Sequence, residues 1–293
     1  MRQETLPFDS PKKKDIIFLN SHSQLTRPME NKFYPFDRIS ARSEKTQVDV
    51  SVVMPVYNEG DIVEEVLLDW NQGLLEMGLN YEIIVINDGS LDGTGRVLDK
   101  LRREIPQLRV IHQLNTGHSQ AIRRGYSLAR GQYILQCDLN GRYEPEDFSR
   151  LWEAKANHRM VVAHRTHRLD SFPRRLFSNF LNRITHWIFR VKLQDPNVPF
   201  RLFKKEPLND FMKVLPIHWK NINLALSIYV STNTPQRIVE VKIPFRKRAL
   251  GKSSTSTYDL INLSFECLGE MLSLRKLLKN QNFNPSPVPV RAL

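Results

Sequence analysis

Two apolar segments, each followed at once by a polar turn, constrain the fold of this chain more than any other feature. Residues 50–56 read VSVVMPV and residues 81–86 read YEIIVI, and such valine- and isoleucine-rich runs are typical of strands buried on both faces of a parallel sheet. Open α/β sheets bind their ligands at the carboxyl ends of these strands. We therefore expect the two turns to form part of a functional site.

Helical periodicity alternates with short apolar segments through the first half of the chain. Apolar spacing of three and four residues predicts helices over 60–79, 93–104 and 119–130, and further strands are expected over 108–112 and 132–137. Strands and helices in alternation predict a mostly parallel sheet with helices on its faces and right-handed crossovers. The expected fold class is α/β, with a Rossmann-like sheet.

The alternation becomes less regular beyond residue 151. A strand is expected over 160–163, a long amphipathic helix over 175–191, and apolar segments over 222–229 and 238–243. The last strong signal is a second amphipathic helix over 258–279 with a basic end, followed by a proline-rich tail.

Charge is distributed unevenly along the chain. Residues 51–150 carry 15 acidic and 10 basic side chains, whereas residues 151–293 carry 24 basic and 9 acidic ones. The second half is therefore expected to face an anionic partner, such as phosphates, an anionic bilayer or nucleic acid, unless it is simply a solvated basic surface. Two distant cysteines, Cys137 and Cys267, favour a reducing cytoplasmic setting, and no apolar stretch is long enough to predict a membrane-spanning helix.

The polar turns supply hydrogen-bonding side chains and lack a phosphate-binding loop. The first turn carries Tyr57, Asn58 and Glu59, and the second carries Asp88 and Asp92. The sequence contains no GxGxxG motif and no Walker lysine motif. This absence argues against a dinucleotide-dependent oxidoreductase and against a P-loop enzyme.

Six motifs in a fixed order resemble those of family 2 glycosyltransferases, and more narrowly the branch that transfers sugars to polyprenol phosphate and dolichol phosphate. The motifs are PVYNEGD, VINDGSLDGT, LNTGHSQAIRRGY, LQCDLNGRYEPEDF, DPNVPFRLFKKEPL and FRKRALGKSS. Six motifs in the same order make a chance match far less credible than one short motif would. The resemblance implies a GT-A fold, a nucleotide-sugar donor and an inverting transfer.

The resemblance also implies which residues bind the donor. Those of the first two motifs are Pro55, Tyr57, Glu59 and Asp88. Asp88 is implied to hydrogen-bond the base, because a carboxylate accepts from a ring N–H of uracil or guanine, and an aromatic ring can lie against the base face. The Asp88-Gly-Ser sequence also suits a cap on the helix over 93–104. Gly117 would let the backbone approach the ribose or diphosphate closely.

The fourth motif departs from the family pattern. Relatives usually carry DxDxQ, whose side chains hold a divalent cation and the donor diphosphate, whereas this chain has Asp138, Asn140 and Arg142. The changes make the site two charges less favourable to Mg²⁺ or Mn²⁺. One hypothesis is that the Arg142 guanidinium replaces the cation and stabilises the leaving diphosphate. The competing hypothesis is a protein that binds a nucleotide sugar without transferring it.

The last two motifs supply candidates for the reacting phosphates. The resemblance places Asp195 and Arg201 near the reacting phosphate. Arg201 would supply a planar phosphate donor and Asp195 would orient it or approach the acceptor, unless the two form a buried pair that braces a loop. Arg248 and Ser253 are implied to contact the diphosphate or the lipid phosphate. A lipid phosphate is already anionic and needs little help from a general base, so His118 is expected to be a positioning or surface residue.

The expected organisation is a disordered or surface-draped arm over 1–47, a GT-A catalytic domain over 48–255 and a helix with tail over 256–293. The two amphipathic helices and the basic surplus suit a cytoplasmic protein attached peripherally to the inner, anionic face of a membrane, unless both helices simply pack on the sheet. The expected function is transfer of a sugar from a UDP- or GDP-sugar to polyprenyl phosphate. A non-lipid glycan acceptor stays open, and a nucleic-acid partner is not expected because no such module is visible.

Overall fold

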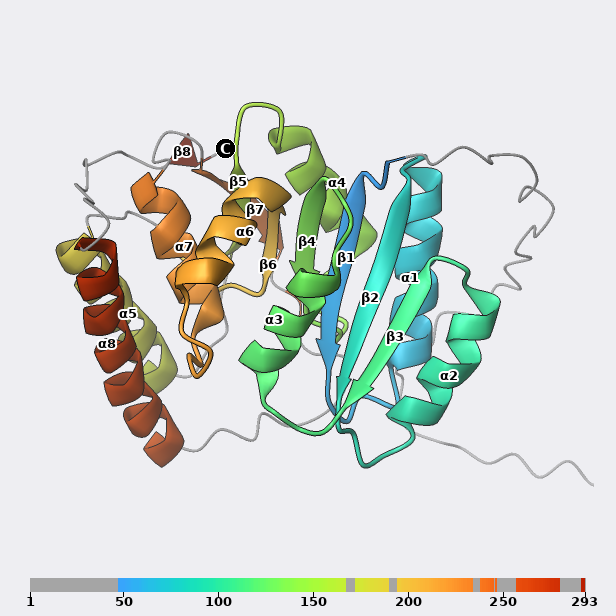
Figure 1. Cartoon of the computed structure of the whole chain (residues 1–293), viewed down its shortest axis with the longest axis horizontal. Helices are drawn as coiled ribbons and strands as arrows, with labels where there is room; N and C mark the ends of the chain where they lie inside the picture. Colours follow the sequence, from blue (N-terminus) through green and yellow to red (C-terminus); the bar gives the residue numbers. More distant parts are fainter. Residues whose placement is uncertain are drawn as a thin grey trace, which may run out of the picture. The chain divides into compact units, whose positions relative to one another are not determined.

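A central sheet of eight strands, in the order β3-β2-β1-β4-β6-β5-β7-β8, organises the part of the chain that the computed structural model describes (Figure 1). The described residues are 47–166, 172–189, 194–233, 238–244, 246, 257–279 and 291–292. They belong to one unit, Lys45–Leu293. The predicted arm over 1–47, apart from Gln47, and the candidates Arg248 and Ser253 lie outside the described residues.

The sheet is mostly parallel, as the alternation of strands and helices predicted. Its strands are β1 (Val50–Val56), β2 (Tyr81–Asp88), β3 (Leu108–Gln113), β4 (Tyr133–Cys137), β5 (Met160–Thr166), β6 (Phe200–Lys204), β7 (Ile238–Pro244) and β8 (Arg291–Ala292). Strand β6 runs antiparallel to both of its neighbours, β4 and β5, whereas the other neighbouring pairs are parallel. The parallel β3-β2-β1-β4 half brings the ends of β1, β2 and β4 to one edge.

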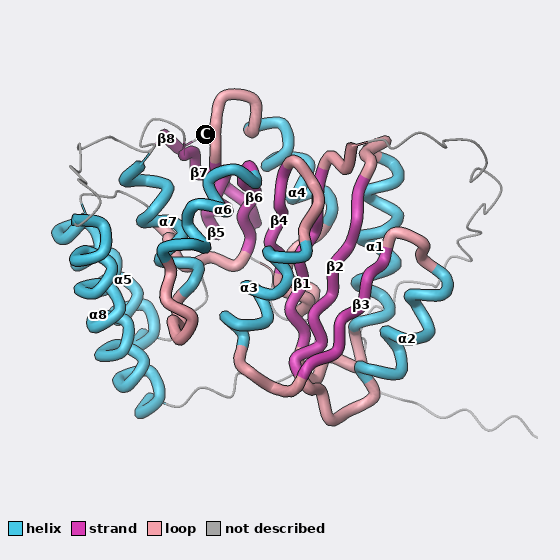
Figure 2. The backbone as a smooth tube through the Cα atoms, viewed as in Figure 1, coloured by secondary structure: helices cyan, strands magenta, loops and turns pink. Residues whose placement is uncertain are grey.

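Helices cover both faces of this sheet. They are α1 (Val63–Glu76), α2 (Thr94–Glu104), α3 (His118–Leu128), α4 (Pro145–Ala154), α5 (Phe172–Phe189), α6 (Lys205–Val214), α7 (Ile222–Asn233) and α8 (Thr257–Lys279). Figure 2 shows α3 and α6 in front of the sheet and α4 behind it, and α5 and α8 pack against each other. Within the described ranges, no helix combines the length and the apolar character needed to cross a bilayer.

The predicted elements of the first half are confirmed, whereas the second half contains elements that the sequence did not reveal. Residues 222–229 form most of helix α7, which is buried along all of its described side chains. A helix buried all round has no polar face, and its periodicity therefore cannot distinguish it from a buried strand. Strand β6 was missed because it carries a buried arginine, Arg201, within a short segment that ends in lysine.

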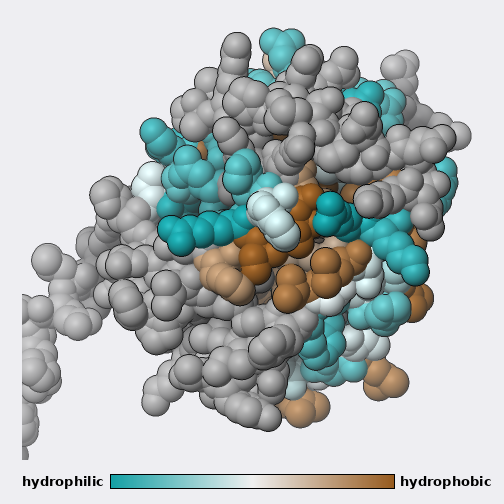
Figure 3. All heavy atoms as spheres, turned by 90° about the vertical axis from the view of Figure 1, so that its left-hand side faces the viewer, coloured by the Kyte–Doolittle hydropathy of each residue, from teal (hydrophilic) through white to brown (hydrophobic). Residues whose placement is uncertain are grey.

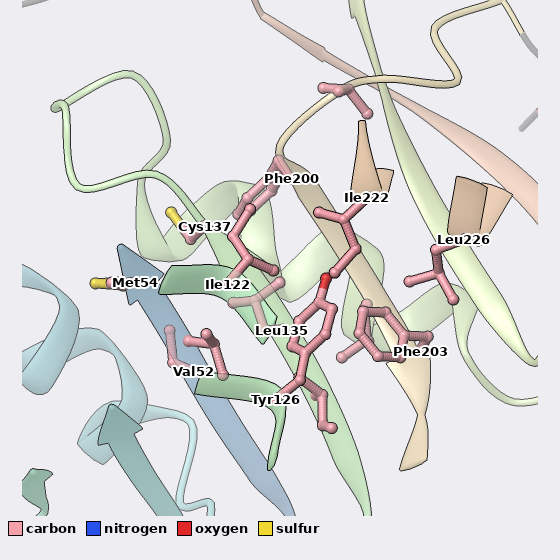
Figure 4. Packing of buried hydrophobic residues seen from close by; sticks show 14 of the residues in the cluster. Val52, Met54, Ile122, Tyr126, Leu135, Cys137, Phe200, Phe203, Ile222 and Leu226 are labelled. Atoms are coloured by element: carbon pink, nitrogen blue, oxygen red, sulfur yellow. The ribbon is translucent and has the colours of Figure 1, made fainter. Parts of the chain in front are cut away.

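The core lies between the sheet and its covering helices, and the part beside α3 includes aromatic residues from distant segments (Figure 4). Tyr126 of α3 meets Phe203 of β6 edge to face at 5.3 Å, and its hydroxyl donates to Gln136 Oε1 at 2.5 Å. Gly125 lets α3 approach the sheet, because a Cβ at this position would lie 2.3 Å from Cγ1 of Val53. This close contact packs the second half of α3 against the middle of β1.

Candidate active site

A cavity of about 310 Å³ lies at the carboxyl ends of β1, β2 and β4. The strand order reverses between β1 and β4, and such a switch point is where open α/β sheets bind ligands. Residues from the first four motifs meet there: Pro55, Tyr57, Glu59, Asp88, Gly117, Asp138 and Asn140. Asn115 and His118, which the sequence did not assign to a ligand, line the same cavity.

The loop after β1 is tied to the loop after β2 by side chains from both. Ser90 Oγ accepts from the amide of Asn58 at 3.0 Å, and Asn58 Oδ1 accepts from the amide of Leu91 at 2.8 Å. Asp92 Oδ2 accepts from the amide of Gly60 at 3.0 Å. Asn58 has a φ of 54°, a left-handed conformation that asparagine adopts more readily than most residues. The loop that carries Tyr57 and Glu59 is therefore held in one conformation.

Asp88 organises the opposite wall of the cavity. Its Oδ1 accepts from Gln113 Nε2 at 2.7 Å and from both the amide (2.9 Å) and the hydroxyl (3.2 Å) of Thr116, and its Oδ2 accepts from the amide of Gly117 at 2.9 Å. A carboxylate offers about four acceptor positions. Oδ2 accepts one of these bonds and therefore keeps an acceptor position for the predicted contact with the nucleotide base. The predicted cap of α2 by this segment is not formed: the N-cap residue is Gly93, and the amide of Thr94 donates to Asp92 Oδ1 at 2.9 Å.

The loop after β4 brings Asp138 and Asn140 into the cavity but leaves Arg142 outside its lining. Asn140 Oδ1 accepts from the amide of Arg142 at 3.2 Å. Arg142 Nε is buried and has no hydrogen-bond partner among the described residues. The side chain of His118 lies next to Asp138 instead, with its Nε2 3.6 Å from Asp138 Oδ1. The structure thus does not support the hypothesis that Arg142 acts inside this cavity.

The side chains around Asp138 fit a divalent cation poorly. Mg²⁺ and Mn²⁺ prefer several carboxylate or carbonyl oxygens, and the motif supplies one carboxylate and one amide. Across the described ranges, no three His, Cys, Asp or Glu side chains are grouped so that they could hold a metal ion. Asn140 already uses its oxygen to accept from a backbone amide.

Asp195 does not line this cavity and belongs to a second polar cluster. Its Oδ2 accepts from Nε and Nη2 of Arg165 at 2.8 and 2.7 Å, which is a two-point ion pair. Glu240 Oε1 accepts from the amides of Gln194 and Asp195 at 2.8 and 3.3 Å. Burial raises the pKa of Glu240. Asp195 is thus paired with Arg165 of β5, and the alternative reading of a buried ion pair between Asp195 and Arg201 is not found among the described residues.

Arg201 is fully buried, and its five N–H groups all donate within the protein. Nε and Nη2 donate to the carbonyl of Val198, Nη2 also donates to Pro196 O at 3.1 Å, and Nη1 donates to Asn223 O at 2.7 Å and Ser227 Oγ at 2.9 Å. Burial lowers the pKa of this guanidinium to about 10. The predicted phosphate contact would require these bonds to break, so the structure gives Arg201 a bracing role in the loop after Asp195.

The sixth motif begins beside α4. Arg246 Nη2 lies 2.8 Å from Glu144 Oε2, and its Nη1 donates to Asp147. Glu144 and Asp147 also form the reciprocal cap of α4, which follows the Asp138 loop. The start of this motif is thus anchored close to the loop that enters the cavity.

A family model and several relatives match this chain in sequence. The model of glycosyl transferase family 2 matches residues 51–211. The chain is 29% identical over 220 residues to an undecaprenyl-phosphate 4-deoxy-4-formamido-L-arabinose transferase of Klebsiella pneumoniae (strain 342), covering 74% of this chain and 65% of that protein. It is 27% identical over 225 residues to the protein of the same name from Shewanella sediminis (strain HAW-EB3), covering 76% and 66%. The chain thus spans about two thirds of the length of these relatives.

Solved structures share the fold at lower sequence identity. Glucosyl-3-phosphoglycerate synthase from Mycobacterium tuberculosis, in complex with Mn²⁺, UDP-glucose and phosphoglyceric acid, superposes with a TM-score of 0.61 at 17% identity, covering 83% of this chain and 88% of that chain. Mannosyl-3-phosphoglycerate synthase from Rubrobacter xylanophilus gives a TM-score of 0.57 at 15% identity, covering 80% and 75%. The predicted α/β fold of the GT-A type is confirmed.

Proposed function

The chain belongs to glycosyl transferase family 2, and from this premise we propose that it transfers a sugar from a UDP- or GDP-sugar to polyprenyl phosphate with inversion. The observation that carries the proposal is the cavity after β1, β2 and β4, where residues of four separate motifs meet. The named acceptor of the similar transferases, undecaprenyl phosphate, supports the choice of acceptor.

The donor is proposed to bind with its base near β1 and β2 and its diphosphate near α3. Tyr57 is 44% exposed at the cavity, so its ring is available to lie against a base. Gly117, with a φ of 92° and open space where a Cβ would stand, leaves room for the diphosphate at the amino end of α3. Backbone N–H groups at a helix amino end attract anions.

In the proposed reaction, an oxygen of the acceptor phosphate forms a bond to the anomeric carbon of the sugar. The bond from this carbon to the donor diphosphate breaks on the opposite side, and the nucleoside diphosphate leaves with the bonding electron pair. The acceptor phosphate is already ionised at neutral pH, so no proton has to be removed from it. Stabilisation of the leaving diphosphate is the main requirement.

The α5–α8 side of the protein is proposed to lie on an anionic membrane surface at the inner, cytoplasmic face. Three apolar side chains are exposed there: Phe180 (55%), Trp187 (80%) and Leu272 (52%). Arg183, Arg275 and Lys276 are also exposed on these helices. Figure 3 shows hydrophobic residues gathered on this side with hydrophilic residues beside them. Exposed aromatic and basic residues together favour binding to anionic lipid headgroups.

Vesicle flotation tests the membrane contact. Trp187→Ser is expected to reduce recovery with vesicles of phosphatidylcholine and phosphatidylglycerol several-fold. Leu75→Ser, at a half-exposed apolar position on α1, serves as the matched control and should float as the unaltered protein does. Equal flotation of both variants would contradict the assignment of this face.

Transfer itself is tested with labelled UDP- and GDP-sugars and polyprenyl phosphate, in parallel with Mn²⁺ and with EDTA. The expected result is label in the organic extract in both conditions, because the residues around Asp138 fit a cation poorly. Transfer only with Mn²⁺ would assign a metal to the site. Binding of a nucleotide sugar without transfer to lipid would direct the search to a non-lipid glycan acceptor.

A further inference from the structure

His118 lies at the amino end of α3, next to a residue that is hydrogen-bonded to the cavity wall. It is the first residue of α3 and follows Gly117, whose amide donates to Asp88 Oδ2 at 2.9 Å. Its side chain is 53% exposed and lines the cavity, with Nε2 3.6 Å from Asp138 Oδ1. The imidazole is therefore open to a ligand and held beside the loop after β4.

The other ionisable side chains that line the cavity offer a diphosphate no positive charge. They are Tyr57 and Glu59 from the loop after β1, Asp88 from β2 and Asp138 from the loop after β4. Among the described residues that line the cavity, His118 alone can carry a positive charge. The eleven-residue helix α3 adds a partial positive charge at the same end.

We propose that His118 binds the diphosphate of the nucleotide-sugar donor and provides, with the amino end of α3, N–H donors to the diphosphate at a site where the altered DxDxQ motif fits a metal poorly. This inference rests on the proposed function, since it concerns the same donor. An imidazole donates an N–H to a phosphate oxygen, and as imidazolium it also adds a charge. The neighbouring Asp138 then orients the ring.

If His118 had only a structural role, its replacement would lower the unfolding temperature; the binding role predicts otherwise. Because its side chain is about half exposed, its replacement leaves no void in the core. His118→Gln is therefore expected to unfold at the same temperature as the unaltered protein. Its effect should appear in the affinity for diphosphates and not in the affinity for the nucleoside alone.

Calorimetric titration of the full chain with UDP, GDP, uridine and guanosine, in EDTA and in Mn²⁺, tests the proposal. His118→Gln is expected to weaken binding of the preferred diphosphate in EDTA about 10- to 100-fold, the effect of losing a charge-assisted hydrogen bond, and to leave nucleoside binding unchanged. His118→Lys, which retains a cation, should recover most of the affinity. His218→Gln, at an exposed histidine that lines a separate groove, is the matched control and should bind as the unaltered protein does.

Two results would overturn the role of His118. One is unchanged diphosphate affinity in His118→Gln, and the other is binding by the unaltered protein that requires Mn²⁺ and disappears in EDTA. In both cases the donor still binds, and the proposed function stands. If the unaltered protein binds neither UDP nor GDP under any condition, the proposed function fails together with the role of His118.

Discussion

Replacement of Arg201 by methionine separates a bracing role from a phosphate-binding role. The guanidinium lies in the interior between β6 and α7, where all five of its N–H groups donate to carbonyl or hydroxyl oxygens. Methionine fills much of the same volume but offers no donor. Buried acceptors that lose their donor, above all Val198 O with its two bonds, then pay a desolvation penalty.

The magnitude follows from two opposing contributions. Hydrogen bonds from a charged donor contribute about 1.5 kcal/mol each at the lower end of their range. Burial of the charge opposes them: the pKa of Arg201 falls to about 10, which corresponds to a cost of about 3 kcal/mol at neutral pH. We expect Arg201→Met to lower the free energy of unfolding by about 3–5 kcal/mol, as for other broken buried charge contacts.

Urea unfolding followed by circular dichroism measures this loss, and calorimetry with UDP measures donor binding below the unfolding transition. Arg102→Met, at an exposed arginine of α2 that pairs with Asp99, is the control and should change the free energy of unfolding by less than about 0.5 kcal/mol. The bracing role is refuted if Arg201→Met unfolds at the same urea concentration as the unaltered protein yet loses transferase activity. That result would place the guanidinium on a phosphate during the reaction.

Three further perturbations test the packing and the polar network. Asp88→Asn should lower the free energy of unfolding by about 1–3 kcal/mol and weaken UDP binding, because one of the two carboxylate oxygens that accept from the Thr116 and Gly117 amides is replaced by an NH₂ group. Unaltered UDP affinity in calorimetry would contradict this expectation. Gly125→Ala should destabilise the protein by about 1–3 kcal/mol through overpacking, and a raised melting temperature would disprove the close approach of α3 to the sheet. Burial raises the pKa of Glu240 above its ordinary 4.5, so the folded state binds this proton more tightly than the unfolded state, and ionisation of Glu240 lowers the free energy of unfolding as the pH rises. Glu240→Gln keeps the acceptor oxygen and should therefore be more stable than the unaltered protein at pH 8 but not at pH 4. Parallel profiles of stability against pH for the two proteins would refute the argument.

The sequence by itself determined the sheet of the first half and the position of the cavity. Strands and helices there have clear periodicities, and the carboxyl ends of parallel strands must meet at one edge. Local pattern was therefore enough to bring Tyr57 and Asp88 together before any contact was known, and the resemblance to family 2 glycosyltransferases added Asp138. It was not enough for α7, whose uniform burial removes the polar face that marks a helix.

Only the tertiary structure decided which polar side chains are partners. Asp195 pairs with Arg165, 30 residues away, although Arg201 is much nearer in sequence, because the sheet places β5 beside the loop after α5. His118 and Asp138 come together across two elements in the same way. Ion pairs and hydrogen bonds depend on distances of a few ångströms between segments that the sequence keeps apart, and hydrophobic periodicity carries no information about them. The sequence therefore predicts where the site lies, whereas the tertiary structure determines which charged residues line the cavity and which are buried in the core.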